Sequence, residues 1–143
     1  MKRFILSLFF LPALSTAAGA INPDVTQDNI YDKICIPGWT KTARPSVSYT
    51  NGIKYELLRR ANISIGDARL YELDHIIPLA VGGAPRDPNN LQLQLWDGDK
   101  GAHRKDVLES LIHRKVCRGE MTLAEGQAVF DDWFANYSRF IRK

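Results

Sequence analysis

The chain of 143 residues has only two cysteines, and it contains neither a C-x-x-C nor an H-E-x-x-H sequence. The first absence argues against a cysteine-based zinc site, which needs more ligands at closer spacing. The second argues against a zinc peptidase that carries that motif. The sequence also has no internal repeat, no low-complexity segment and no legible RNA-binding motif. Its length suits one domain and is too short for two ordinary ones.

Long hydrophobic runs are lacking except at the N-terminus. There, a short basic start is followed by an apolar run from Phe4 to Leu14 and by the small residues Ala18-Gly19-Ala20, a pattern typical of a cleaved signal peptide. An uncleaved anchor is the weaker alternative, because the uncharged stretch is marginal for a membrane span and Pro12 interrupts it. We therefore expect a signal peptide at 1–20 and a single domain at 21–143. That domain would be periplasmic or secreted, without stable membrane association after cleavage.

A strong charge of either sign is lacking as well. The chain has 19 Lys and Arg against 16 Asp and Glu, and removing Lys2 and Arg3 with the signal peptide leaves 17 against 16, a net charge of +1. Global attraction to a polyanion would be weak, so any nucleic-acid binding must depend on a local patch. The basic segment 41–69 is one candidate, although a solvated helix face is the simpler interpretation.

The two cysteines, Cys35 and Cys117, lie near opposite ends of the expected mature chain. An even number of cysteines in an exported protein favours a disulfide over two free thiols. In the chain-entropy treatment, closing a loop of this length would stabilise the domain by ~4–5 kcal/mol.

The pattern along the chain is that of an α+β protein. Leucine and glutamine alternate without a fault in LQLQL, which predicts a strand with its leucines toward a core and its glutamines toward solvent. An irregular loop is expected at 35–48, and a loop rich in glycine, proline and asparagine separates the strands. The expected elements are helices at 26–34, 50–61 (capped by Thr50) and 101–116, strands at 70–75 and 91–95, and a last helix to about 141 that starts with the capping box of Thr122 and Glu125.

Asp74 and His75 stand side by side at the end of the first predicted strand, in YELDHIIPLAVGG. Successive side chains on a strand point to opposite faces, so the two suit different tasks, a hard oxygen ligand for a cation and a nitrogen base. Asn90 follows at the entrance of the second strand, where a side-chain amide can bridge the backbone of the 76–89 loop.

His103 lies in the first turn of the helix that follows the second strand, with Asp106 at i+3 on the same side. An acid from a strand end and a histidine from a helix start would leave open positions on a shared ion, as a catalytic ion requires. His113 carries no functional prediction, and the surface is its expected place.

D-H, then N after a loop, then H at the start of a helix resembles the His-Asn-His (HNH) endonuclease motif over about residues 70–110. The resemblance implies a ββα-metal fold with flanking helices and metal-dependent hydrolysis of nucleic-acid phosphodiester bonds, with nonspecific cleavage of DNA as the first expectation. It implies Asp74 and His103 as ligands of one divalent ion, His75 as general base and Asn90 as the residue that orients the base. The phrases CIPGWTKTARP and AHRKD also resemble a group of small exported proteins with this motif.

The chain departs from that family in the spacing between Asn90 and His103, which is long because WDGD intervenes. Asp99 or Asp106 could therefore replace or supplement His103. Oxygen and nitrogen ligands do not select one ion; magnesium is the first choice by family analogy, with manganese, nickel or zinc as alternatives. Arg104 and Lys105 are expected to contact flanking phosphates, and the protein is expected to be a monomer.

Two alternatives remain open on the sequence. In the first, the chain is an exported ββα-metal module that binds nucleic acid or a protein without cutting. In the second, it is a small interaction protein held by a disulfide, in which Asp74 and His75 form a buried pair that apolar residues could replace.

Overall fold

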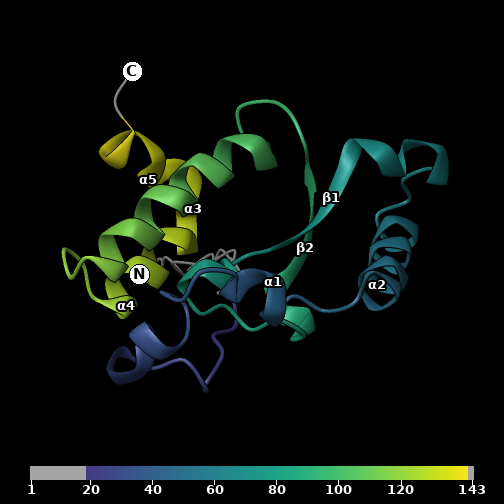
Figure 1. Cartoon of the computed structure of the whole chain (residues 1–143). Helices are drawn as coiled ribbons and strands as arrows, with labels where there is room; N and C mark the ends of the chain where they lie inside the picture. The colour runs from purple at the N-terminus through teal and green to yellow at the C-terminus, as the bar shows by residue number, and fades with distance from the viewer. Residues whose placement is uncertain (1–18, 142–143) are drawn as a thin grey trace, which may run out of the picture.

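The computed structural model describes residues 19–141 and has an α+β fold, with one two-stranded antiparallel hairpin and several helices around it (Figure 1). The α+β class expected from the sequence is therefore confirmed. The expected signal peptide lies outside the described residues except for Gly19 and Ala20. Within 19–141, no helix is long and apolar enough to cross a membrane.

The hairpin consists of β1 (Tyr71–His75) and β2 (Leu91–Leu95), which pair in a register that sets Asp74 opposite Gln92 and His75 opposite Leu91. Both strands lie where the sequence predicts them, and the helix α3 follows β2. The α-helices are α1 (Trp39–Ala43), α2 (Val47–Arg60), α3 (Ala102–Cys117), α4 (Leu123–Ala128) and α5 (Trp133–Phe140). Short 3-10 segments lie at Gln27–Asp32, Ile65–Leu70, Leu79–Val81, Pro88–Asn90 and Val129–Asp132.

Two helices begin at places that the sequence prediction missed. The N-cap of α2 is Ser46 and not Thr50, whose hydroxyl instead donates to the carbonyl groups of Ser46 and Val47. The short helix α1 forms inside the expected loop 35–48 and begins after Gly38, whose φ of 85° lies in the left-handed region that glycine tolerates.

The expected last helix is divided in two. Thr122 and Glu125 form the predicted capping box at the start of α4. The chain then passes through the 3-10 segment Val129–Asp132, and the side chain of Asp132 accepts from the backbone N–H of Ala135 to cap α5. Aspartate at a helix N-cap satisfies an otherwise unpaired donor, which makes a new helix start at this point favourable.

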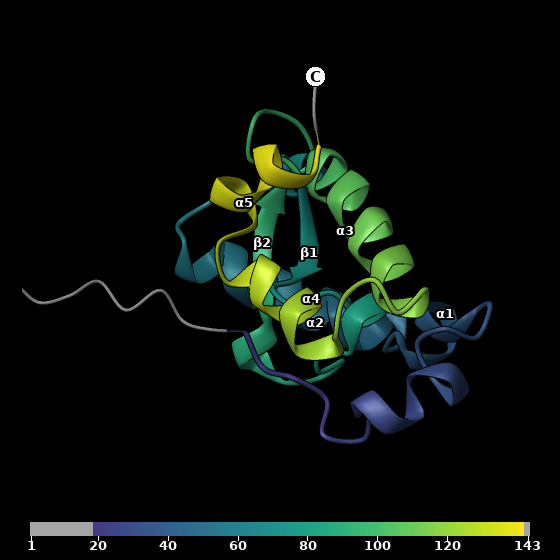
Figure 2. The same ribbon diagram turned by 90° about the vertical axis from the view of Figure 1, so that its left-hand side faces the viewer.

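The main core lies beside the hairpin and not within it. Its buried residues come from the N-terminal segment, the loop after β1, α3 and the C-terminal helical segments: Val25, Ile30, Ile34, Ile77, Val81, Leu108, Ile112, Val116, Leu123, Val129 and Phe130. Figure 1 shows α3 and α2 on opposite sides of the hairpin, and Figure 2 shows α3 running alongside it.

The predicted alternation of β2 holds at its start and fails at its end. Leu91 is buried, but Leu95 is 47 % exposed. Gln94 is buried instead, and its side-chain amide donates to the carbonyl of Lys100. The loop after β2 supplies this acceptor, so the amide of Gln94 is paired where it is buried.

Candidate active site

Asn90 is fully buried at the entrance of β2 and bridges the loop that follows β1. Its Oδ1 accepts from the N–H of Ile77 at 2.8 Å, while its Nδ2 donates to the carbonyl groups of Ile77 and Ala84, both at 3.0 Å. Both ends of the segment between His75 and Pro85 are thereby held at fixed positions. Asn90 makes the loop bridge that the sequence suggests, and its part in orienting the base stays a prediction.

Replacing Asn90 with alanine is expected to destabilise the domain by roughly 3 kcal/mol, because buried N–H and C=O groups would lose their partners at ~1–3 kcal/mol each. Urea denaturation followed by circular dichroism measures the loss. Asn89 is exposed one residue earlier, so Asn89→Ala is the matched control and should change stability by less than ~0.5 kcal/mol. Equal losses in the two variants would show that the bridge contributes nothing.

His75 is the last residue of β1 and is only 5 % exposed. Its Nε2 lies 3.0 Å from the carbonyl oxygen of Pro85. A carbonyl oxygen only accepts, so Nε2 carries the hydrogen and Nδ1 is the unprotonated nitrogen of the neutral ring. Burial lowers the pKa of His75, against the opposing effects of the Pro85 hydrogen bond and of Asp74. The ring is therefore neutral near pH 7 and offers Nδ1 as a base.

Lys105 lies on α3 with its side chain fully buried. Its Nζ donates to Oδ2 of Asp74 at 2.6 Å, to the carbonyl of His75 at 2.6 Å and to Oε1 of Glu109 at 3.0 Å. Burial pushes the pKa of Lys105 down, but the charges of Asp74 and Glu109 outweigh burial, and the pKa is raised overall. The expected phosphate contact of Lys105 would require an exposed ammonium, whereas in this structure the ammonium is buried and turned inward to this cluster.

Two further carboxylates, Glu109 beside Lys105 and Glu72 on β1, lie near Asp74, and neither was identified from the sequence. Burial, together with the charges of Asp74 and Asp106, raises the pKa of Glu72 to about 7. Burial also raises the pKa of Glu109, although the nearby ammonium of Lys105 opposes this. More carboxylates than cations thus gather at this end of α3.

His103 lies in the first turn of α3, as expected, but its surroundings differ from those of Asp74. The imidazole is 64 % exposed, its Nδ1 lies 3.0 Å from Oδ1 of Asp97, and its ring packs against Trp96 with centroids 5.3 Å apart. Asp99 belongs to the same loop and accepts from Arg104 at 2.8 Å. His103 is thus engaged with residues of the loop between β2 and α3, and Asp99 of that loop is engaged with Arg104 of α3.

The side chain of Arg104 is 32 % exposed, and its guanidinium lies over the ring of Tyr137 at 4.3 Å. It is therefore in a position to meet a phosphate, and that contact stays a prediction. Asp106 is exposed on the next turn; burial and the charge of Asp74 raise its pKa, while the charge of His103 lowers it. Its part as a further ligand stays a prediction.

A cleft of about 280 Å³ opens where β1, α1 and α3 meet. Asp74, His75 and Glu109 line it, together with Arg44 from the segment between α1 and α2. His103 is not among its lining residues. Asp74 and His75 therefore share one cleft, and the cleft combines a neutral base, two carboxylates and an exposed guanidinium.

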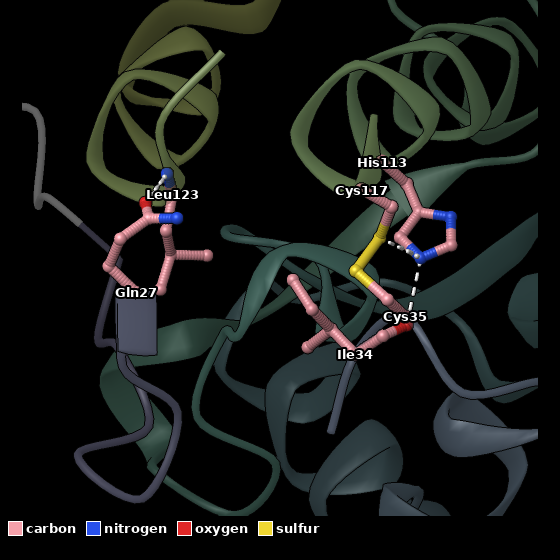
Figure 3. Close-up of a disulfide and its surroundings, with 6 residues drawn as sticks. All are labelled: Gln27, Ile34, Cys35, His113, Cys117 and Leu123. Carbon is pink, nitrogen blue, oxygen red and sulfur yellow. Dashed lines mark hydrogen bonds between the residues drawn. A yellow bond between two sulfur atoms is a disulfide. The ribbon is translucent and has the colours of Figure 1, made fainter. Parts of the chain in front are cut away.

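The disulfide between Cys35 and Cys117, predicted from the cysteine count, is present (Figure 3). It joins the segment before α1 to the last residue of α3. His113, expected at the surface, is half-buried beside it, with Nε2 2.8 Å from the carbonyl oxygen of Ile34 and 3.4 Å from Sγ of Cys117. The same view shows Gln27 accepting from the N–H of Leu123 at 2.6 Å, a second link between the N-terminal segment and the C-terminal helices.

Cys35, His113 and Cys117 are the one set of three groups, among residues 19–141, that lies close enough together to share a metal ion. The sulfur atoms of the two cysteines are joined in the disulfide, whereas a metal would require free thiolates. Asp74 offers hard oxygen donors at the cleft, which suit magnesium or manganese. Of the predicted ligands, Asp74 alone lines the cleft; His103 is turned to Asp97, and the bound ion stays a prediction.

Comparison of the chain with protein families, with curated proteins and with solved structures finds no match in any of the three. The resemblance to His-Asn-His nucleases therefore rests on the motif residues and stays a prediction.

Proposed function

We propose that the chain is an exported, metal-dependent endonuclease of the His-Asn-His type, with a ββα-metal fold and His75 as its general base. The observation that carries this proposal is the imidazole of His75. Its Nε2 is engaged by the Pro85 carbonyl, burial keeps it neutral, and it lines a cleft beside Asp74 at the end of a hairpin. A tautomer fixed in this way leaves Nδ1 to accept a proton.

In the proposed reaction, Nδ1 of His75 removes a proton from a water molecule, which attacks the phosphorus atom in line with the leaving 3′-oxygen. Asn90 fixes the loop that supplies the Pro85 carbonyl and so holds the ring in place. General-base help is worth ~10²–10⁴ in rate, whereas enzymes reach ~10⁶–10¹⁷ over the uncatalysed reaction. The remaining acceleration requires positive charge at the phosphate.

Two sources of positive charge fit the cleft. Arg44 is exposed, lines the cleft, and lies close enough to affect the pKa of His75, Glu72 and Asp106, so its guanidinium is suited to a phosphate oxygen. When bound, a divalent ion would supply further charge to the phosphate oxygens. Asp74 would hold that ion, with His103, Asp99 or Asp106 as predicted further ligands and magnesium as the first choice, followed by manganese, nickel or zinc.

Incubation of the purified protein with supercoiled plasmid tests the proposed function directly. We expect nicking in the presence of at least one of the four ions and none after EDTA, because the base alone leaves most of the required acceleration unsupplied. A parallel reaction with single-stranded RNA decides the substrate class. His75→Asn is the control for a contaminating nuclease and should be inactive in the same assay.

If the protein binds plasmid but does not nick it with any of the four ions, the non-catalytic binding module would replace the proposed nuclease. Nicking that continues unchanged in EDTA would remove the metal from the proposal and leave His75 as the base. Gel mobility and nicking are read from the same samples, so the two outcomes are distinguished in one experiment.

A further inference from the structure

Lys105 is a fully buried lysine, and lysine is rarely buried without partners. Its partners are three oxygen atoms, one from Asp74, one from Glu109 and the carbonyl oxygen of His75, all within 3.0 Å of Nζ. Two carboxylates and a backbone carbonyl around a single cation are the donor types that a magnesium, manganese or calcium ion selects. The ammonium thus takes the place that a hard divalent cation could take.

We propose that Lys105 is the resident cation of the site, and that its ammonium excludes a divalent ion from the oxygen cage of Asp74, Glu109 and the His75 carbonyl. We define the oxygen cage as Oδ2 of Asp74, Oε1 of Glu109 and the carbonyl oxygen of His75. Lys105 would hold this place whether or not the chain cleaves nucleic acid. The inference therefore goes beyond the proposed function and does not depend on it.

The position of Lys105 also affects the backbone of His75, the proposed general base. Lys105 holds the carbonyl of His75, while Pro85 holds the ring of the same residue. The lysine thus fixes the end of β1 relative to α3 and acts as a positioning residue for His75. It also means that an ion used in catalysis would have to bind Asp74 through Oδ1, since Oδ2 is engaged by the ammonium.

Removing the ammonium should convert the oxygen cage into a divalent-ion site. Lys105→Ala leaves two carboxylates and a carbonyl without a cation and frees the space that the lysine side chain fills. Mn²⁺ binding, measured as the loss of the electron paramagnetic resonance signal of the free ion, is expected to tighten at least about tenfold relative to wild type, because a unit charge at contact distance no longer repels the ion. Addition of Asp74→Asn to this variant should abolish the gain.

Lys100 provides the matched control, since it is an exposed lysine in the loop before α3. Lys100→Ala should leave Mn²⁺ affinity unchanged. If Lys105→Ala does not fold, Mn²⁺ affinity is measured on the double variant Lys105→Ala/Glu109→Gln. This variant keeps three oxygen donors in the oxygen cage but only one negative charge. Mn²⁺ affinity equal to that of wild type in the folded variant would overturn the proposal, and this readout does not involve cleavage of nucleic acid.

Discussion

Replacement of His75 by alanine is expected to lower the rate of phosphodiester cleavage by ~10²–10⁴-fold, the usual contribution of a general base. The physical reason is that Nδ1 of the buried, neutral ring is the base of the proposed reaction. His113 also lines the cleft, but its Nε2 is held by the Ile34 carbonyl beside the disulfide, and His103 lies outside the cleft. Initial rates of plasmid nicking at pH 7 measure the effect.

His75→Asn separates the chemical role from the structural one. The asparagine amide keeps an N–H that can be offered to the Pro85 carbonyl, yet it is not a base near neutral pH. We therefore expect His75→Asn to lose as much activity as His75→Ala while its melting temperature stays closer to that of wild type. An active His75→Asn protein would assign the base to another residue. The exposed His103→Ala protein should instead lose activity only together with affinity for the ion, if His103 is a ligand.

The hairpin and α3 could be predicted because their signals are local. Strict alternation in 91–95, a turn-rich loop before it and an apolar helical stripe after it each depend on neighbouring residues alone. The role of Asn90 could also be predicted, since a side-chain amide at the end of such a loop commonly binds the loop backbone. The disulfide followed from cysteine number and the expected compartment.

Lys105 was misjudged because its burial depends on tertiary contacts. By composition, a lysine beside Arg104 suggests a basic surface, yet Lys105 lies on the buried stripe of α3 with Ala102, Leu108, Ile112 and Val116. That spacing was the available signal: a lysine three residues before a buried leucine must either reach solvent or find carboxylates. Glu109 at i+4 was the partner within reach.

The end of β2 and the division of the last helix also followed from tertiary structure. Leu95 is exposed because the core lies beside the hairpin, toward α3 and the C-terminal helices. Gln94 is buried because the following loop supplies an acceptor for its amide. Alternation identifies the two faces of a strand but not which face the rest of the chain will cover.

Removal of the disulfide is expected to cost ~4–5 kcal/mol of unfolding free energy in the chain-entropy treatment. Cys35 and Cys117 are 82 residues apart, so the link restricts a long loop in the unfolded chain. Cys35→Ala/Cys117→Ala is the direct variant, and urea denaturation of both proteins, with and without dithiothreitol, measures the loss. A domain of this size should lose roughly 10–20 °C in melting temperature.

The double variant is its own control for reduction, because dithiothreitol should destabilise the wild type and leave the variant unchanged. Neither cysteine lines the cleft, so the variant should retain nicking activity at temperatures where it is folded. The reason is that the link from Asp74 and the His75 carbonyl to Lys105 is independent of the sulfur atoms. A loss below ~1 kcal/mol would mean that the hydrogen bonds of His113 to Ile34 and of Gln27 to Leu123 hold the N-terminal segment in place without the covalent link.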